Sequence, residues 1–421
     1  MKKIILLIGL NLLVLFSSYA QYKHSKTSIF KSYTGLVMTG YQGWFNAPDD
    51  GAGRGWNHFV GRGQLADGNC KFDLWPDTRE YAKTYNSTFN LPDGSPAKLF
   101  SAYDASTQDI HFKWMKQYGI DGVFMQRFVS NLKNEKSLNH NNVVLENALK
   151  ASEKYGRAIS VMYDLSGMQP GDAKVIIEDW KYLVNKVKLT SRGNKQTYLY
   201  HNGKPLVALW GVGFAGRKYG LKDIQPVIDF LKNDPKYGGC SILLGVPTRW
   251  RELKNDADSD SSLLTLLKQI DIVQPWFVGR FKESNVADMF ALIQKDMAWC
   301  TANNVDYVPV IYPGFSWHNM YNNSPQNLIP RDRGNFFWEQ LSGTIKAGVS
   351  MVYIAMFDEI DEGTAIFKIS KNPPVGKSLF VTFEDDIPED YYLYLAGYAS
   401  KVLKKQLPMP PSIPLPLKVK K

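Results

Sequence analysis

Short apolar runs alternate with longer amphipathic stretches along most of the chain. Apolar runs bounded by turn residues are typical of strands buried on both faces, whereas apolar residues spaced three and four positions apart are typical of helices. The expected strands are 36–45, 121–128, 158–165, 205–210, 241–246, 272–276, 307–311 and 351–357. The expected helices are 107–118, 142–155, 172–187, 223–231, 261–269, 285–302, 335–347 and 388–405.

Strands that alternate with helices imply βαβ units and a parallel sheet. Eight of each predict an α/β fold, a single (β/α)8 TIM barrel, rather than an open sheet. The alternation covers 21–405, which we expect to form one domain, and the Pro- and Lys-rich stretch 406–421 is expected to be an extended tail. The longest interruption is a Gly-rich loop, 46–63, and an irregular stretch, 68–96. Long loops of this composition are more often functional than plain connectors.

The first twenty residues have the pattern of a secretory signal peptide. Lys2 and Lys3 are basic, 4–16 is apolar, and 18–20 is a small-residue cleavage site. We therefore expect cleavage near Ala20–Gln21 and a mature chain that is periplasmic or secreted, with a retained membrane helix as the alternative. No later stretch reaches ~18 uninterrupted apolar residues, so no membrane span is expected in the mature chain.

Charge and composition exclude several classes of function. The net charge of +10 comes from scattered lysines without an arginine-rich stripe, so we attribute it to solubility or cell-wall attraction and expect no nucleic-acid partner. The three cysteines are far apart and the six histidines do not cluster, so no metal site is expected. The chain also lacks a phosphate-binding glycine loop, a GxSxG elbow and an HExxH motif. We expect no cofactor and a monomer.

The last expected strand runs into four carboxylates within five positions, Asp358, Glu359, Asp361 and Glu362. Clustered carboxylates repel one another and are costly to desolvate, so this grouping indicates acid/base chemistry. In a helical turn, residues three apart have Cβ atoms roughly 5–6 Å apart. That is close to the carboxyl separation of about 5–5.5 Å in retaining glycosidases. A solvated acidic loop is the alternative interpretation.

Polar and aromatic residues recur at the carboxyl ends of the expected strands, where barrel enzymes carry their active sites. With 11 Trp and 23 Tyr in the chain, these positions favour a carbohydrate site, because flat rings stack on sugars and polar groups bind hydroxyls. The candidate substrate-binding residues are Tyr41, Trp44, Trp56, Asn57, His58, Gln126, Arg127, Tyr163, Asp164, Trp210, Trp250, Trp276, Arg280, Tyr312, Trp317 and His318. Structural alternatives stay open for several of them: Arg127 can pair with a core acid, His58 and His318 can be loop histidines, and Trp276 can be core.

Several short motifs resemble glycoside hydrolase families 71 and 99, the endo-acting α-mannanase and α-glucanase group. The segment 359–364, EIDEGT, resembles that group's strand-eight motif, and the match is closest to its bacterial 71/99-like branch. Further similar motifs are 41–44 with 56–58, 119–122, 202–205 and 309–314, in the same order along most of the chain.

The resemblance implies a catalytic barrel that retains the configuration of an α-linked glycan and uses no cofactor. It implies that Glu359 deprotonates the sugar 2-hydroxyl, whose oxygen displaces the leaving group to give a 1,2-anhydro sugar. Glu362 would protonate the leaving oxygen and later activate water. Family 99 usually has Trp and His between the two glutamates, where this chain has Ile360 and Asp361. We therefore expect an oligosaccharide or polysaccharide substrate other than ordinary α-mannan, and a non-catalytic glycan-binding barrel is the alternative.

Overall fold

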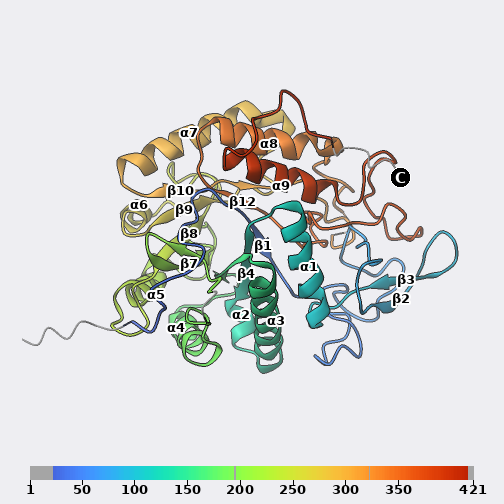
Figure 1. The fold of residues 1–421 in the computed structure, drawn as a ribbon, viewed down its shortest axis with the longest axis horizontal. Helices are drawn as coiled ribbons and strands as arrows, with labels where there is room; N and C mark the ends of the chain where they lie inside the picture. Colours follow the sequence, from blue (N-terminus) through green and yellow to red (C-terminus); the bar gives the residue numbers. More distant parts are fainter. Residues whose placement is uncertain (1–21, 194–195, 322, 416–421) are drawn as a thin grey trace, which may run out of the picture.

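The apolar runs form the parallel strands of a closed barrel in the computed structural model, which describes residues 22–193, 196–321 and 323–415 (Figure 1). The expected signal peptide lies outside the described residues. The barrel strands are β1 (Val37–Tyr41), β4 (Gly122–Phe128), β5 (Ala158–Asp164), β7 (Lys204–Trp210), β8 (Ser241–Val246), β9 (Ile272–Pro275), β10 (Asp306–Tyr307), β11 (Val310–Ile311) and β12 (Val352–Ile354). Hydrogen-bonded neighbours follow the order β10-β9-β8-β7-β5-β4-β1-β12-β11.

β10 and β11 are two halves of one barrel strand. β10 pairs with β9, and β11 pairs with β12. Between them, the Val308 amide donates to the Val273 carbonyl at 3.0 Å, and the Tyr353 amide donates to the Pro309 carbonyl at 3.2 Å. Proline has no N–H to donate, which accounts for the interrupted ladder at Pro309. The described residues therefore contain eight parallel barrel strands, and the strand between β9 and β12 closes the ring.

Helices follow the strands in sequence and surround the barrel, which confirms the (β/α)8 architecture (Figure 1). They are α1 (Ala105–Tyr118), α3 (Glu135–Tyr155), α4 (Ala173–Tyr182), α5 (Leu221–Asn233), α6 (Ser262–Leu267), α7 (Val286–Ala302), α8 (Asn335–Lys346) and α9 (Tyr391–Leu403). α1 and α3 end where expected, at Gly119 and Gly156, whose φ values of 89° and 60° are left-handed and suit glycine. In the part of the chain that the structure describes, no helix is long and apolar enough to cross a membrane.

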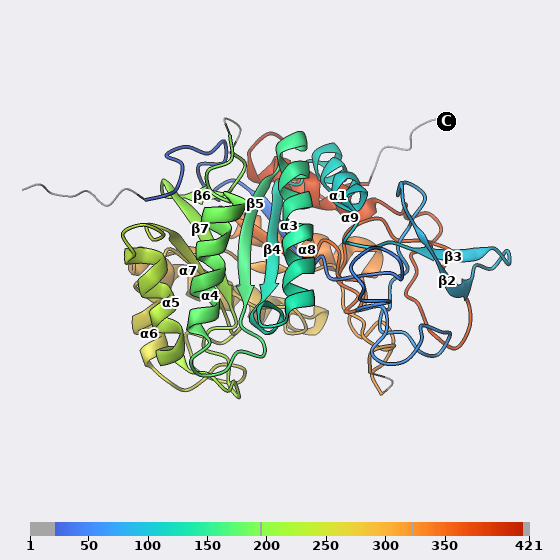
Figure 2. The ribbon, with the colours of Figure 1, turned by 90° about the horizontal axis from the view of Figure 1, so that it is seen from below.

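A long excursion separates β1 from α1 and contains an unexpected hairpin. β2 (Tyr85–Asn90) and β3 (Pro96–Leu99) pair antiparallel and project from the side of the barrel (Figure 2). We expected this stretch to be irregular, because the exposed face of β2 is polar and its sequence, YNSTFN, is not an apolar run. The turn signal was present as Pro92-Asp93-Gly94, with Gly94 at a φ of 83°. The short elements α2 (Val129–Leu132) and β6 (Tyr200–His201) were also not expected.

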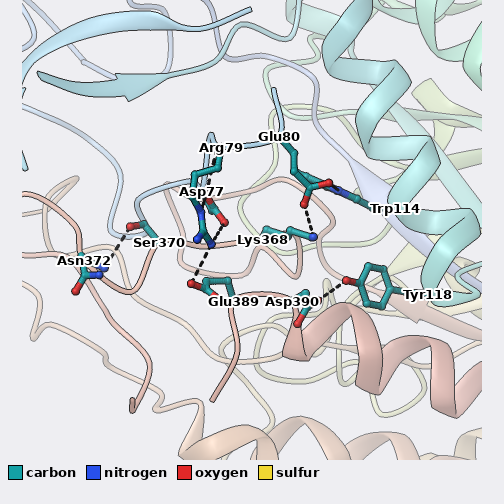
Figure 3. A network of polar contacts seen from close by, with 10 residues as sticks. All are labelled: Asp77, Arg79, Glu80, Trp114, Tyr118, Lys368, Ser370, Asn372, Glu389 and Asp390. Carbon is teal, nitrogen blue, oxygen red and sulfur yellow. Dashed lines mark hydrogen bonds and ion pairs between the residues drawn. The ribbon is translucent and has the colours of Figure 1, made fainter. Parts of the chain in front are cut away.

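Ion pairs tie this excursion to the segment that follows the last strand (Figure 3). Arg79 Nη2 lies 2.6 Å from Asp77 Oδ2 and 3.0 Å from Glu389 Oε1, and Lys368 Nζ lies 2.5 Å from Glu80 Oε1. A surface cleft of about 750 Å³ lies beside this network, between the hairpin and residues 370–372. Asp358, Glu359, Asp361 and Glu362 do not line that cleft, so we place the candidate site elsewhere. Beyond α9, the segment 407–415 folds back, and Tyr391 Oη donates to the Pro414 carbonyl at 3.3 Å.

Candidate active site

The chain leaves β12 and enters an acid cluster, a term used here for Asp358, Glu359, Asp361 and Glu362, at the carboxyl end of the barrel. Asp358, Glu359 and Asp361 are 0%, 5% and 2% exposed, whereas Glu362 is partly exposed. The cluster is therefore not a solvated acidic loop. We call the surrounding carboxyl ends of the strands, with the loops that follow them, the barrel mouth.

Asp358 fastens the acid cluster to the end of β1. Its two carboxylate oxygens accept hydrogen bonds from the Gln42 and Gly43 amides, each at 2.8 Å. Burial raises the pKa of Asp358 to about 7, and the nearby charge of Asp361 acts in the same direction. Because both oxygens are occupied by backbone amides, we assign Asp358 a structural role.

Glu359 is held in place by two side chains. Gln42 Nε2 donates to Oε1 at 2.7 Å, and Thr364 Oγ1 donates to Oε2 at 3.0 Å. Burial raises the pKa of Glu359 well above its ordinary value, and the charges of Glu362 and Asp361 raise it further. The two hydrogen bonds oppose this rise, since they stabilise the carboxylate form.

Glu362 is the member of the acid cluster that is partly exposed. Among the described residues, none donates a hydrogen bond to its carboxylate. Burial raises its pKa to about 7, with further contributions from Asp361 and Asp164. Two neighbouring carboxyl groups cannot easily ionise together, and the charge of Glu362 is among the causes that raise the pKa of Glu359. Glu359 has two donors that stabilise its carboxylate form, whereas no described residue donates to the Glu362 carboxylate.

The backbone around Glu362 leaves no room for a side chain at the next position. The Ser316 amide donates to the Glu362 carbonyl at 2.9 Å. Gly363 has a φ of 66°, and a Cβ added there would lie 2.8 Å from the Ser316 nitrogen. Arg331 Nη2 donates to the Gly363 and Ala365 carbonyls at 2.9 and 2.6 Å. These contacts fix the direction in which Glu362 leaves the chain.

Asp73 joins the loops on either side of the acid cluster. Its carboxylate accepts hydrogen bonds from Ser316 Oγ at 2.5 Å and from the His318 and Asn319 amides at 2.7 and 2.8 Å. Its own amide donates to the Ile360 carbonyl at 3.0 Å. Burial raises the pKa of Asp73, and these donors oppose that rise. Asp73 therefore links the β1–α1 excursion, the loop before α8 and the acid cluster.

His58 and Trp44 lie on the β1 side of the cluster. The two rings stack with centroids 4.0 Å apart and planes 4° apart. His58 Nδ1 lies 3.5 Å from Asp361 Oδ2, so the histidine faces the acid that separates the two catalytic candidates. Asn57 Nδ2 donates to the Trp44 carbonyl at 3.0 Å and braces this arrangement. Trp44 Nε1 and Asp361 Oδ1 are buried and have no partner in the described structure.

Four further expected residues, Gln126, Asp164, Trp210 and Trp276, lie near or just after the carboxyl ends of β4, β5, β7 and β9. Gln126 Nε2 donates to Tyr353 Oη at 3.0 Å, and Asp164 pairs in register with Trp210, so their side chains share one face of the sheet. Trp276 packs edge-on against Trp210, with ring centroids 5.1 Å apart. Burial raises the pKa of Asp164 to about 6.

Five of the expected site residues have their side chains in structural contacts instead. Arg127 Nε donates to Asp179 Oδ2 at 2.8 Å, and Tyr163 Oη donates to the same oxygen at 2.8 Å, on the helix side of the sheet. Side chains alternate along a strand, so Gln126 faces inward and its neighbour Arg127 faces outward. The others are Tyr41, which bonds to His111, Trp250, which donates to Asp296, and Tyr312, which donates to the Phe281 carbonyl.

The side chains of the remaining expected residues contact loop residues rather than the acid cluster. Trp56 packs against Phe59, and Trp317 packs against Phe315 and Tyr321. Arg280 Nε lies 3.4 Å from Asp256 Oδ2. His318 Nδ1 bonds to the Ser324 carbonyl at 2.6 Å. These contacts correspond to the loop interpretation left open for His318.

Sequence reasoning did not assign site roles to Gln42, Thr364 and Asp73. Gln42 and Thr364 were within the motifs at 41–44 and 359–364, but their contacts with Glu359 depend on the folded backbone. Asp73 is in a stretch without periodic signal. In residues 22–193, 196–321 and 323–415, no group of three or more His, Cys, Asp or Glu residues is arranged to hold a metal ion.

A known family matches the part of the sequence that contains the acid cluster. The profile of the family described as "Domain of unknown function (DUF5010)" matches residues 145–376, which is 232 of the 421 residues. The chain belongs to the DUF5010 family. The DUF5010 match includes Asp164, Trp210 and all four acids, but the residues that hold them from the β1 side precede it.

Two solved structures show the same barrel as this DUF5010 protein. They are the GH99 endo-alpha-mannosidase from Bacteroides thetaiotaomicron in complex with BIS-TRIS-propane and a second structure of the GH99 endo-alpha-mannosidase from that organism. Their TM-scores are 0.62 and 0.61, at 15% sequence identity, and each match covers 88% of this chain and 98% of the other. The DUF5010 chain therefore has a glycoside hydrolase-like fold. No curated protein matches its sequence.

Proposed function

We propose that this DUF5010 protein is an exported glycoside hydrolase that cleaves α-linked glycans with retention. The observation that carries the proposal is the pair Glu359 and Glu362 at the end of the last barrel strand. One carboxylate is held by two donors, and the other is partly exposed with a pKa raised to about 7. A general acid with its pKa near the working pH is the most effective proton donor to a leaving group.

In the proposed reaction, Glu359 takes the proton from the sugar 2-hydroxyl. The freed oxygen forms a bond to C1, and the bond from C1 to the leaving oxygen breaks as Glu362 donates its proton to that oxygen. The product of this step is a 1,2-anhydro sugar. Glu362, now a carboxylate, then takes a proton from water as the water adds to C1. The bond between C1 and O2 breaks, and Glu359 returns the first proton to O2.

The residues around the pair suit this division of roles. Gln42 and Thr364 fix both oxygens of Glu359, so its carboxylate has a single orientation. Glu362 accepts no hydrogen bond from any described residue and is partly exposed. A group that exchanges a proton with the leaving sugar has to be accessible in this way. Trp44, Trp210 and Trp276 are half-buried rings at the barrel mouth, and such rings bind sugar faces.

The GH99 likeness supports an α-linked substrate, since the two similar structures are endo-alpha-mannosidases. The anhydro-sugar route suits sugars in which O2 can attack C1 from the side opposite the leaving group. Ile360 and Asp361 replace the Trp and His usual in family 99, so we propose a substrate other than ordinary α-mannan. The protein is proposed to act as a monomer, without a cofactor, in the periplasm or outside the cell.

A screen for reducing-sugar release tests the proposal. The mature chain is incubated with α-mannans, α-glucans and plant and host glycans, beside its Glu362→Gln variant. We expect release from at least one α-linked glycan and loss of that release in the variant. Nuclear magnetic resonance of the first product should show the α-anomer. Glycans that bind without any release would instead support the non-catalytic glycan-binding barrel.

A further inference from the structure

The barrel mouth contains an arginine that the proposed reaction does not use. Arg217 lies in the loop after β7 and is partly exposed. Its guanidinium carbon lies 5.7 Å from the centroid of the Trp210 ring and 5.5 Å from that of Phe214. We call Trp210, Phe214, Arg217 and Trp276 the Arg217 platform, since Trp276 packs on Trp210 as well.

Arg217 keeps most of its hydrogen-bonding capacity free. Among the described residues its guanidinium makes one hydrogen bond, from Nη1 to Ser166 Oγ at 3.4 Å, and no carboxylate oxygen lies within 4.0 Å of it. A guanidinium has five N–H donors in a planar fork that matches a carboxylate or a sulfate. Stacking on two aromatic rings therefore fixes the fork while leaving its donors available to a ligand.

Neighbouring arginines at this end of the barrel are paired. Arg249 Nη1 lies 3.2 Å from Glu252, Arg251 Nε lies 2.9 Å from Asp296, and Arg280 Nε lies 3.4 Å from Asp256. Among these loop arginines, Arg217 differs in having a stacked but unpaired guanidinium within the described structure. Asp164 is near enough for Arg217 to lower its pKa, but Asp164 Oδ1 accepts the Ser166 amide at 2.7 Å.

The inner face of the barrel beside the platform has buried polar groups without hydrogen-bond partners in the described structure. Within the described residues, Trp210 Nε1 is buried without a hydrogen-bond partner, and so are both amide atoms of Gln274, a residue that is 0% exposed. Gly245 pairs in register with both residues, and a Cβ there would lie 2.4 Å from Trp210 Cδ1. The indole therefore lies over Gly245, next to the Gln274 amide. Unsatisfied buried polar groups are costly, so their grouping here indicates a polar ligand.

The platform adjoins the catalytic pair. Asp164 pairs in register with Trp210, and its charge contributes to the raised pKa of Glu362. A sugar on the platform is thus close to the bond that Glu362 would protonate. The carboxylates of the acid cluster repel an anionic sugar, so its binding there needs a cation such as Arg217.

We propose that the Arg217 platform binds a sugar that carries a carboxylate or a sulfate, with Arg217 holding the anion and Trp210 and Gln274 donating to hydroxyls. This inference rests on the proposed function and makes the substrate an acidic α-linked glycan, either a uronic acid polymer or a sulfated one. Both share a planar or tetrahedral array of anionic oxygens that the arginine fork can grip.

Binding measured without turnover tests this proposal. Calorimetric titration of the Glu362→Gln protein uses α-linked uronic acid oligosaccharides, sulfated oligosaccharides, and the carboxyl-reduced and desulfated forms of each. We expect one acidic class to bind roughly ten- to a hundred-fold more tightly than its neutral form, because hydrogen bonds to charged groups contribute about 1.5–3 kcal/mol. The acidic class that shows the difference identifies the source of the anion.

Arg217→Met in the same background should abolish that difference, and Arg217→Lys should keep part of it. Arg62→Met is the matched control, since it removes an exposed arginine for which no ion pair occurs in the described structure. Equal binding of acidic and neutral forms overturns the proposal, as does an equal loss of both in Arg217→Met. If acidic glycans bind through Arg217 but the unmutated protein releases no sugar, the platform stands and the hydrolase proposal fails. If the protein hydrolyses neutral glycans and shows no preference for acidic ones, the hydrolase proposal stands and the platform proposal fails.

Discussion

His58 Nδ1 lies 3.5 Å from Asp361 Oδ2, and the His58 ring lies flat on Trp44. The pair places a group that can carry positive charge beside Asp361, which has no proton transfer of its own in the proposed reaction. Asp361 contributes to the raised pKa values of Asp358, Glu359 and Glu362. Asp361 is thus a positioning and charge-setting residue between the two catalytic candidates.

Asp361→Asn should shift the pH dependence of catalysis to lower pH. Removing its negative charge makes Glu362 easier to ionise, so the pKa of Glu362 falls and the acid loses its proton earlier as pH rises. The alkaline limb of the kcat/KM profile should move down by on the order of one pH unit. Asn has nearly the same size and shape as Asp, so the shift reports the loss of charge. Asp306→Asn is the control, because Asp306 forms the separate His–Asp pair with His201 at 2.9 Å. An unmoved limb argues against this role.

A 2-fluoro glycoside with a good leaving group distinguishes two roles for Glu359. If Glu359 is a base acting on O2, the fluorine removes the attacking group, and we expect neither turnover nor a covalent adduct. Intact mass spectrometry after incubation checks this outcome. An added sugar mass that maps to Glu359 would show that it attacks C1 directly, as in other retaining enzymes. Glu359→Gln is the control for labelling elsewhere.

Arg127→Met should destabilise the fold rather than weaken substrate binding. Arg127 is 1% exposed and pairs with Asp179, so the variant leaves a buried carboxylate without its partner. We expect a loss of about 3–5 kcal/mol in unfolding free energy, measured by denaturant titration, with KM unchanged in the folded fraction. Lys181→Met, which breaks an exposed pair with Glu178, should cost about 1 kcal/mol or less. A raised KM with normal stability would instead show that Arg127 contributes to substrate binding.

Gly363→Ala should reduce kcat more than it reduces stability. Its φ of 66° strains any side chain, and the new Cβ would meet the Ser316 backbone and displace Glu362. The strain costs about 1–3 kcal/mol, and we expect kcat to fall at least roughly ten-fold, since small misplacements of catalytic groups are costly. Gly348→Ala is the matched control, because Gly348 has a φ of 92° with nothing within 4 Å of the added Cβ. It should show the strain alone, by thermal unfolding, with kcat preserved.

The barrel was predictable because its strands are short apolar runs buried on both faces, such as β5 and β8. Local composition determines that signal. The acid cluster was also visible, because four carboxylates follow the last strand. The β2–β3 hairpin was not predicted, since its polar strand carries little hydrophobic pattern and is stabilised by its neighbours.

Which side chains face the site was harder to predict from the sequence. Gln126 and Arg127 are neighbours near the end of β4, and Tyr163 and Asp164 are neighbours at the end of β5. In each pair one side chain faces the barrel interior and the other faces the helices, and a shift of one residue would exchange them. Backbone register sets that choice. Contacts such as Gln42 with Glu359 connect residues 317 positions apart, and no local pattern encodes them.

The contacts of Gln42 with Asp358 and Glu359 also make the chain's activity depend on its two ends meeting. β1 pairs directly with β12, so the first barrel strand completes its pairing only when the last one is present. A chain whose synthesis stops before the last strand contains Trp44, Trp210 and Trp276 but lacks the acid cluster. Non-local pairings of this kind also form slowly. The acid cluster therefore reaches its contacts with Gln42 and Gly43 only after the final barrel strand has docked beside the first.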